Sequence, residues 1–243
     1  MNIEKLKLMI KNSDNIVFFG GAGVSTESNI PDFRSSSGLF NEKLNKNFTP
    51  EQLVSRTFFN RYTEDFFKFY KDKLIYPDAR PNNAHIALAK LEKSGKLKAV
   101  ITQNIDGLHQ MAGSNNVLEL HGSVNRNYCT DCNKFFSLND ILNLEGVIPH
   151  CDLCGGVVKP DVVLYEEALD DNVITKAINS IRNADLLIIG GTSLKVYPAA
   201  SFINYFRGKN IVVINKDNIN FDNKASLVIN KPIGQVLFKT VLS

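Results

Sequence analysis

The sequence predicts an α/β fold, a doubly wound and Rossmann-like parallel sheet covered by helices. Three observations support this prediction. Short apolar runs rich in β-branched residues recur along the chain, helical patterns separate them, and two of the runs end directly in glycines. Strands buried on both faces of a parallel sheet have such runs, and helices form the crossovers between them. The expected strands are residues 16–19, 98–102, 117–120, 186–189, 211–214 and 227–229.

The expected helices follow from apolar periodicity and from end signals. Residues 1–10 alternate charged and apolar side chains, as in an amphipathic helix. Asn82 or Asn83 can cap a helix that Gly95 ends. Residues 36–81 lack strand-like runs and are rich in aromatic and charged side chains, which indicates an inserted helical module. Three further helices are expected later in the chain, over 171–182, over 198–207 and after Pro232.

The turn after the first strand is rich in glycine. Gly20, Gly21 and Gly23 allow the backbone to turn sharply and to bring its N–H groups close to a ligand. A strand followed by a glycine turn and a helix start is a typical anion site, usually for phosphate. The spacing departs from the dinucleotide pattern G-x-G-x-x-G, because Thr26 stands where the third glycine would be. From this turn alone, a nucleotide site and a tight structural turn both remain open.

Small, polar or titratable residues follow most of the expected strands. In doubly wound sheets, ligands bind beyond the carboxyl ends of the strands. Structural loops alone would not need so many polar groups at one edge, so we expect the ligand site there. The segments concerned are 20–34, 103–106, His121, 191–193 and Asn215.

Composition limits the classes of function. The chain has 243 residues, of which 44% are hydrophobic and 22% charged, as in ordinary globular enzymes. A net charge of +3 is too small to indicate binding to nucleic acid or to an anionic membrane. No apolar run approaches the ~18 residues of a membrane span, and the N-terminus lacks the apolar core of a signal peptide. The expected location is the cytoplasm.

The cysteines give the strongest single signal in the sequence. The four cysteines form two C-x2-C pairs. These pairs offer four thiolates to Zn²⁺ in a closed shell, so the metal would be structural. We expect an inserted zinc-ribbon module over residues 128–157. Disulfides are the alternative, whereas a ribbon that binds nucleic acid would need more basic residues than Lys134. The two pairs are 18 residues apart and contain every cysteine of the chain, Cys129, Cys132, Cys151 and Cys154.

Besides the cysteine pairs, recognisable motifs lie at residues 21–25, 30–34, 102–109, 119–122, 159–163, 191–194 and 214–215. Together, in this order along the chain, they resemble the motifs of the sirtuins, which are NAD-dependent protein lysine deacylases. The motifs cover nearly the whole chain, and so many in register are far more specific than any one of them. The resemblance implies one sirtuin catalytic domain of the bacterial type over residues 1–243, with NAD as cofactor and one structural zinc ion.

The resemblance implies transfer of the acetyl group of an acetyl-lysine side chain to ADP-ribose. Nicotinamide, O-acetyl-ADP-ribose and free lysine are the products. His121, Asn104 and Asp106 would be the catalytic residues, with His121 as general base on a ribose hydroxyl. Acetylated proteins are the expected partners, and the oligomeric state is left open. A sirtuin-type protein ADP-ribosyltransferase is the alternative, because both routes release nicotinamide; a dehydrogenase and a non-catalytic NAD sensor fit less well.

The resemblance also implies which residues contact NAD. Asp106 and the Ile105 backbone would hold the nicotinamide carboxamide, Phe33 would exclude water, and Arg34 would lie near the phosphates. From its position in the chain, and not from the resemblance, Ile233 is expected to contact the adenine. The full expected set is Gly21, Ala22, Gly23, Ser25, Thr26, Ile30, Asp32, Phe33, Arg34, Gln103, Asn104, Ile105, Asp106, His121, Gly191, Thr192, Ser193, Asn215 and Ile233.

The acylated peptide is expected to lie extended between residues 162–163 and the loop 195–197, adding a strand. The expected contacts are Val162, Val163, Tyr165 and Val196, with the Val163 carbonyl accepting the lysine Nε–H. This chain departs from the family at two glycine positions, which hold Glu166 and Asn29. Asn tolerates the backbone angles of glycine, so its change is mild, whereas Glu166 adds a carboxylate near the peptide.

The helical module predicts the acyl group. Family members that remove succinyl or malonyl groups carry a Tyr and an Arg three residues apart, where this chain has Phe67 and Tyr70. Without a cation there, an acidic acyl chain would be desolvated unpaired. We therefore expect acetyl or another neutral acyl group, and equal turnover of succinyl and acetyl peptides would contradict this.

Overall fold

The computed structural model describes residues 2–32, 48–219 and 221–243. Its strands form two sheets, six in one and three in the other. The strands of the large sheet are β1 (Ile16–Gly20), β2 (Leu97–Thr102), β3 (Val117–Glu119), β7 (Leu186–Gly190), β8 (Asn210–Ile214) and β9 (Leu227–Ile229). Those of the small sheet are β4 (Gly122–Cys129), β5 (Phe135–Ser137) and β6 (Val158–Val162).

The helices follow the expected pattern in most places. The α-helices are α1 (Asn2–Lys11), α2 (Pro50–Leu53), α3 (Arg56–Arg61), α4 (Thr63–Lys73), α5 (Asn83–Lys93), α6 (Leu108–Met111), α7 (Leu138–Asn143), α8 (Asp171–Asn183) and α9 (Ile233–Leu237). Tighter 3₁₀ turns are η1 (Ala22–Val24), η2 (Thr26–Ser28), η4 (Ala199–Tyr205) and η5 (Asp222–Lys224), and the π-helical turn is η6 (Phe238–Leu242). None of the described helices combines the length and the apolar character that crossing a bilayer requires.

The large sheet confirms the predicted fold class. Its strand order is β3-β2-β1-β7-β8-β9, and every neighbouring pair is parallel. The order reverses between β1 and β7, which pair in register from Ile16 with Leu186 to Gly20 with Gly190. The glycine turns that follow these two strands therefore lie side by side at the point where doubly wound sheets bind ligands.

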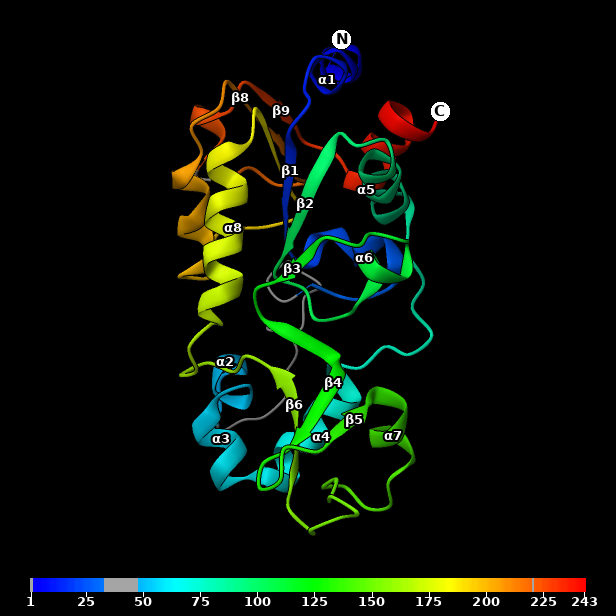
Figure 1. The fold of residues 1–243 in the computed structure, drawn as a ribbon, viewed down its shortest axis with the longest axis vertical. Helices are drawn as coiled ribbons and strands as arrows, with labels where there is room; N and C mark the ends of the chain where they lie inside the picture. The colour runs from blue at the N-terminus through cyan, green and yellow to red at the C-terminus, as the bar shows by residue number, and fades with distance from the viewer. Residues whose placement is uncertain (1, 33–47, 220) are drawn as a thin grey trace.

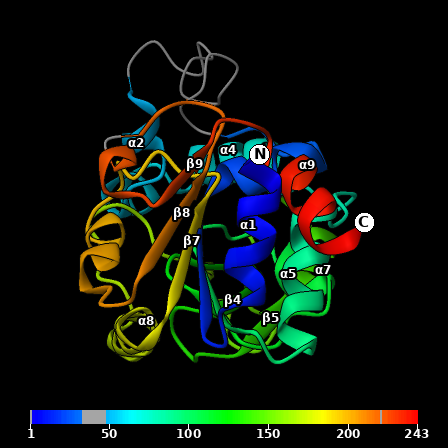
Figure 2. The same cartoon turned by 90° about the horizontal axis from the view of Figure 1, so that it is seen from above.

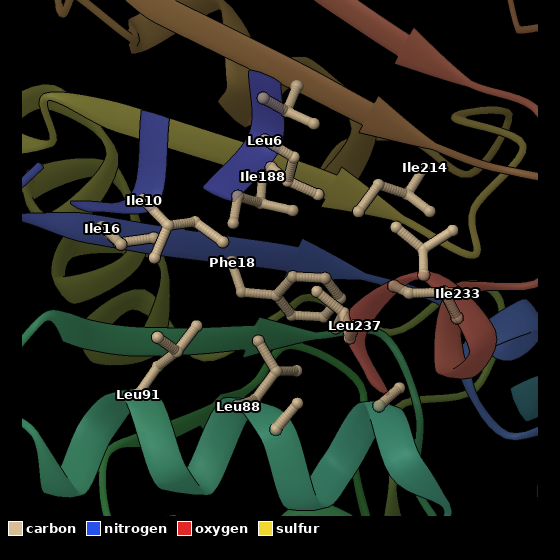
Figure 3. Close-up of a cluster of buried hydrophobic side chains, with 14 of the residues drawn as sticks. Leu6, Ile10, Ile16, Phe18, Leu88, Leu91, Ile188, Ile214, Ile233 and Leu237 are labelled. Carbon is tan, nitrogen blue, oxygen red and sulfur yellow. The ribbon is translucent and has the colours of Figure 1, made fainter. Parts of the chain in front are cut away.

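Helices cover both faces of the large sheet. Helices α1, α5 and α9 lie on one face, and α8 and η4 lie on the other (Figure 2). On the first face, Leu6 of α1, Phe18 of β1 and Leu88 of α5 are fully buried in one cluster (Figure 3). Full burial of such a side chain stabilises the fold by about 1.5–3 kcal/mol. Val17 and Phe19 point to the second face, so β1 is apolar on both sides.

The helices α2–α4 and the small sheet together form a second lobe, the small lobe, at the carboxyl end of the large sheet (Figure 1). Aromatic side chains of the helices, including Phe58 and Phe66, pack in one core with Val124 and Val162 of the sheet. The helical module therefore shares a core with the strands that flank the zinc ribbon, whose own buried side chains form a separate cluster around Cys129 and Phe136. The predicted bounds of both modules, 36–81 and 128–157, stay predictions, and residues 36–47 lie outside the described part of the chain.

The chain enters the small lobe at a tight corner. Gly122 has a φ of +73°, and a Cβ there would collide with the carbonyl oxygen of Asp161. Arg126 then ties the lobes together, because its guanidinium binds Glu119 of β3 at 2.6 Å and Asp161 of β6 at 2.7 Å. This corner places His121 between the large sheet and the small lobe.

The helical segments expected after β1 and after Pro198 are present and are of the tighter 3₁₀ type. The turn after β1 leads into η1 and η2, and residues 199–205 form η4. In η1 the amide of Gly23 bonds to Gly191 of the neighbouring turn, outside the helix. In η4 the amide and hydroxyl of Ser201 both bond to the Pro198 carbonyl, three residues back, which tightens the turn.

Candidate active site and metal centre

A cleft of about 1260 Å³ lies at the carboxyl ends of β1, β2, β7 and β8, and residues of both lobes line it. It brings together nearly all residues that the sequence predicted for NAD and the peptide. From the NAD set, the lining includes Ala22, Gly23, Ser25, Thr26, Ile30, Asp32, Gln103, Asn104, Ile105, Asp106, His121, Gly191, Thr192, Ser193, Asn215 and Ile233. From the peptide set, it includes Val162, Val163, Tyr165 and Val196.

Three predicted residues are not part of this lining. Gly21 lies behind the wall, where a Cβ would come within 3.0 Å of the Thr192 side chain. Its role in the structure is therefore close packing between two turns. Phe33 and Arg34 lie outside the described residues, so their expected roles stay predictions.

The two glycine turns are packed backbone to backbone. The Gly23 amide donates to the Gly191 carbonyl at 2.8 Å. A Cβ on Gly23 would stand 2.9 Å from the Gly191 Cα, and Gly191 has a φ of +57°. Any side chain would force the turns apart, so glycine is required at both positions. The result is a narrow cradle without side chains, which suits the backbone recognition of a phosphate.

An amide–carboxylate network crosses the floor of the cleft. The Ser25 hydroxyl donates to one oxygen of Asp106 at 2.6 Å and accepts from the Asn104 amide at 3.0 Å. The other Asp106 oxygen accepts from the Leu108 backbone amide at 2.9 Å. Asn104 is itself buried, and its backbone amide bonds to Thr102. The carboxylate and the amide are therefore fixed in orientation before any ligand binds.

His121 sits beside this network with a defined tautomer. Its Nδ1 lies 3.0 Å from the Gln103 carbonyl oxygen, which can only accept, so Nδ1 carries the proton. The other nitrogen, Nε2, is then the basic one in the neutral ring. Burial lowers the pKa of His121, although the hydrogen bond to Gln103 opposes this shift. The ring is consequently neutral near pH 7 and ready to take a proton.

The segment after β6 presents one free carbonyl to the cleft. Val163 donates its amide to the His121 carbonyl, and Leu164 donates to the Glu167 carboxylate at 2.9 Å. Lys159 binds the Val162 carbonyl at 3.0 Å and Glu167 at 3.1 Å. Within the described residues, this leaves the Val163 carbonyl without a protein partner. The partly buried Lys159–Glu167 ion pair holds this geometry in place.

The four cysteine sulfurs converge in the small lobe. Their ligand atoms all lie within 4.8 Å of one another. The Cys129 and Cys154 sulfurs are 3.4 Å apart, and those of Cys132 and Cys151 are 3.6 Å apart. Sulfurs bound tetrahedrally at ~2.3 Å from Zn²⁺ are roughly 3.8 Å apart, whereas a disulfide bond is about 2.05 Å long. The spacing therefore fits zinc and excludes disulfides.

The backbone around the cluster favours thiolates. Amides of Cys132 and Asp131 donate to the Cys129 sulfur and lower its pKa to about 7. The Gly156 amide also donates to the Cys154 sulfur, although hydrogen bonds with the neighbouring cysteines raise the pKa of that thiol to about 12. Four thiolates would complete the shell of one zinc ion, so the metal would hold the ends of β4 and β6 together without a catalytic position.

The residues of the cleft and the cysteine cluster match a known protein family. A sequence model of the Sir2 family matches residues 21–198, which include the cradle, the network, His121 and all four cysteines. The chain belongs to the Sir2 family. It is 71% identical over 240 residues to an NAD-dependent protein deacetylase of Clostridium perfringens, with 98% of each chain covered. It is 63% identical over 234 residues to one of Clostridium tetani, with 96% and 95% covered.

Solved structures of Sir2 proteins agree. A Sir2 complex with a p53 peptide and NAD+ superposes with a TM-score of 0.87 at 36% identity, covering 98% of this chain and 96% of that chain. A Sir2 variant with a deacetylated p53 peptide and 3'-O-acetyl ADP-ribose gives a TM-score of 0.89 at 35% identity, with 98% and 97% covered. The resemblance that the sequence motifs indicated is thereby confirmed.

Both departures of this Sir2-family chain from the usual glycines occur at left-handed backbone positions. Asn29 has a φ of 63° and Glu166 a φ of 75°. The left-handed conformation is strained for a glutamate, and hydrogen bonds offset the strain. The Glu166 carboxylate accepts from the Thr57 amide at 2.9 Å and from its hydroxyl at 2.7 Å. The predicted carboxylate near the peptide is therefore tied to α3.

Sequence reasoning missed the part of this Sir2 cleft that comes from distant elements. Lys216 lines the cleft directly after Asn215, so its place after β8 was a usable signal. Glu167 lay next to a recognised motif, but its pairing with Lys159 depends on the turn between them. Val54 and Leu74 of the helical module also line the cleft. In the sequence, nothing distinguishes them from the other apolar and aromatic residues of that module.

Two buried histidines make the stability of this Sir2 chain sensitive to acid. The rings of His85 and His109 are 4.7 Å apart and nearly inaccessible. Burial is the main cause that lowers the pKa of His85 to about 4 and that of His109 to about 3. Below the unfolded value of 6.5, the unfolded chain binds protons that the native chain does not. Stability should therefore fall by about 1.4 kcal/mol per pH unit per histidine between pH 6.5 and these values.

Urea unfolding at several pH values, in wild type and in His109→Phe, tests this expectation. The wild-type free energy of unfolding should decline more steeply with acid than that of the variant. Parallel slopes would contradict a neutral, buried His109.

Proposed function

We propose that this chain is an NAD-dependent protein lysine deacetylase of the cytoplasm. The observation that carries the proposal is the meeting of the glycine cradle, the Asn104–Asp106 network and His121 in one cleft with the free Val163 carbonyl. Support comes from relatives named NAD-dependent protein deacetylase that match over almost their whole length. The catalytic domain spans 1–243, with the helical module at 36–81 and the zinc ribbon at 128–157.

The cleft residues divide into a cofactor part and a peptide part. When bound, NAD supplies a ribose that gives up nicotinamide and accepts the acyl group. The cradle and Thr192, with Ser193 and Asn215, bind the phosphates and the adenine-side ribose. Asp106 and the Ile105 backbone hold the carboxamide, and Asn104 orients the nicotinamide ribose. Asn104 and Asp106 are already positioned by the contacts described above, which lowers the entropic cost of binding.

His121 acts as the general base. It would accept a proton at Nε2 from a ribose hydroxyl, while its Nδ1–H stays on the Gln103 carbonyl. That hydrogen bond also stabilises the imidazolium that forms. Because burial favours the neutral ring, the base is available at neutral pH.

The peptide part lies at the edge of the small lobe. An extended peptide adds a strand between Val162–Val163 and the loop carrying Val196, with Tyr165 beside it. The Val163 carbonyl accepts the Nε–H of the acylated lysine, which is the hydrogen bond that the segment leaves unmade. The deacetylated lysine lacks the acyl group that the cleft encloses. The product peptide therefore binds more weakly and leaves.

A single assay tests the function. The chain is incubated with NAD and an acetyl-lysine peptide, and nicotinamide and O-acetyl-ADP-ribose are measured by mass spectrometry. Formation of both, in step with loss of the acetyl-peptide, is expected. ADP-ribose attached to protein without consumption of the acetyl-peptide would instead indicate a sirtuin-type ADP-ribosyltransferase. A succinyl-peptide should react far more slowly than the acetyl-peptide.

Glu167→Gln should weaken peptide binding and spare NAD. The change removes the charge that holds Lys159 and weakens the bond to the Leu164 amide. We expect a roughly five- to tenfold higher KM for the acetyl-peptide, with the KM for NAD changed by less than about twofold. Glu64→Gln, which breaks the exposed Lys68–Glu64 pair of the same lobe, is the matched control. Equal KM changes for both substrates would refute this positioning role.

A further inference from the structure

The residue after Tyr165 has unpaired backbone groups at the cleft. Glu166 lines the cleft and is exposed. Within the described residues, neither its amide nor its carbonyl has a protein partner. Tyr165 itself is already paired, because its amide donates to Val54 and its carbonyl accepts from Arg56. A peptide strand added beside this segment therefore finds free hydrogen-bonding groups at Val163 and at Glu166.

The Glu166 carboxylate is held at a fixed position beside these groups. One oxygen, Oε2, accepts from both the amide and the hydroxyl of Thr57. The other oxygen, Oε1, has no partner among the residues that the structure describes. The hydrogen bonds from Thr57 are the main cause that lowers the pKa of Glu166, so the group is charged at neutral pH. A charged oxygen thus remains for a ligand, on a side chain that loses little conformational entropy when the ligand binds.

The charges around Glu166 leave it open to the peptide. Arg56 and Arg61 of α3 act on it from a distance, but neither is among the described residues that line the cleft. Lys195 lines the cleft from the loop on the other side of the expected peptide. Glu167, the next carboxylate of the segment, is neutralised by its ion pair with Lys159. Of the two carboxylates that follow Tyr165, Glu166 is therefore the one left for a ligand.

We propose that Glu166 makes the enzyme prefer acetyl-lysine sites with another lysine or an arginine within two positions of the acetylated residue. Glu166 is three residues from Val163, whose carbonyl we assign to the lysine Nε–H, so the peptide residue beside it is close to the acetylated one. Side chains that face each other across paired strands have Cβ atoms about 4.5–5.5 Å apart. A basic side chain there gains a charge-assisted hydrogen bond to Oε1, whereas an acidic one meets a like charge.

The glycine that the family usually has at this position could not discriminate in this way. The inference rests on the proposed deacetylase function and deepens it, because it names the class of peptide that the same cleft selects.

Peptides of one sequence that differ at one flanking residue test the preference. Lysine, glutamine or glutamate is placed in turn at each of the two positions before and the two positions after the acetyl-lysine. At the best of these positions, we expect wild type to favour lysine over glutamate by roughly fivefold in kcat/KM at low salt, with glutamine between them. The ratio should shrink as the salt concentration rises, because the pair is exposed.

Variants assign the preference to one carboxylate. Glu166→Gln keeps an acceptor for Thr57 and removes the charge, so the ratio should fall to about one. Glu145→Gln removes an exposed charge from the zinc-ribbon module, away from the described cleft lining, and should keep the wild-type ratio. Equal rates for the three peptides at every position, or a preference that Glu166→Gln retains, overturn the proposal.

Binding measurements separate this proposal from the proposed function. If Glu166→Gln fails to fold, the affinities of wild type for the same peptides, measured by fluorescence anisotropy at low and high salt, decide by the same ratio. If the proposed deacetylase function is wrong, none of the peptides is consumed in the presence of NAD. The affinity ratio would still test Glu166 in that case.

Discussion

Replacing His121 with alanine is expected to lower kcat/KM for an acetyl-lysine peptide by about 10²- to 10⁴-fold. His121 is the only imidazole on the described cleft wall, and its Nε2 is the basic atom of the fixed tautomer. No neighbouring side chain can take its place, because Asp106 already accepts from Ser25 and Leu108. The measurement is initial rates of O-acetyl-ADP-ribose formation at several peptide concentrations.

The control for this variant is His150→Ala, which removes an exposed imidazole bonded to the Gly155 carbonyl in the small lobe. It should retain the wild-type rate. A His121→Ala enzyme with more than a tenth of the wild-type kcat/KM would exclude the general-base role. The pH profile gives a second check. Since burial places the pKa of His121 below its ordinary 6.5, the acid limb of kcat/KM should have its midpoint below that value.

Removal of zinc should disrupt the fold of the small lobe, and it should lower the activity as strongly as His121→Ala does. Binding of a structural zinc ion contributes about 10–16 kcal/mol, comparable to the ~5–15 kcal/mol stability of a whole domain. The cluster joins the ends of β4 and β6, which carry Val124 and Val162 of the shared core. Chelation, or Cys151→Ala, should therefore open the small lobe and abolish deacetylation.

Three measurements should change together when the zinc ion is lost. Zinc content falls from one ion per chain, limited proteolysis begins within the small lobe, and Tm drops. Asp152→Asn, which removes the charge of the exposed ion pair with Lys134 beside the knuckle, is the control and should keep its zinc. A metal-free protein with unchanged Tm and activity would show that the cysteines do not need the ion.

The sequence was most informative where local chemistry decides the structure. The apolar runs that became β1 and β7 are buried along their whole length, and Asn82 caps α5 as expected from its position alone. The residues after these strands were predictable as a site because parallel strands place their ends at one edge. The Sir2-family motifs indicated the other NAD residues, and the four cysteines indicated the zinc site.

The sequence was least informative where structure depends on distant contacts. Strand β4 carries Asn125, Arg126 and Asn127, so no apolar run marks it. Arg126 pairs with carboxylates of β3 and β6, and the Asn127 side-chain NH2 donates to the Val124 and Phe136 carbonyls. These partners cannot be predicted from the sequence of β4 itself.

That shared core has a consequence for biosynthesis. Helices α3 and α4 are translated well before β6, so their aromatic side chains, such as Phe58 and Phe66, emerge from the ribosome without the strand residues that cover them. A nascent chain with exposed aromatic side chains is prone to aggregate until they are buried. The four cysteines join the end of β4 to the segment that leads into β6, which brings Val162 to this core, so zinc supply during translation should set how much of the nascent chain escapes aggregation.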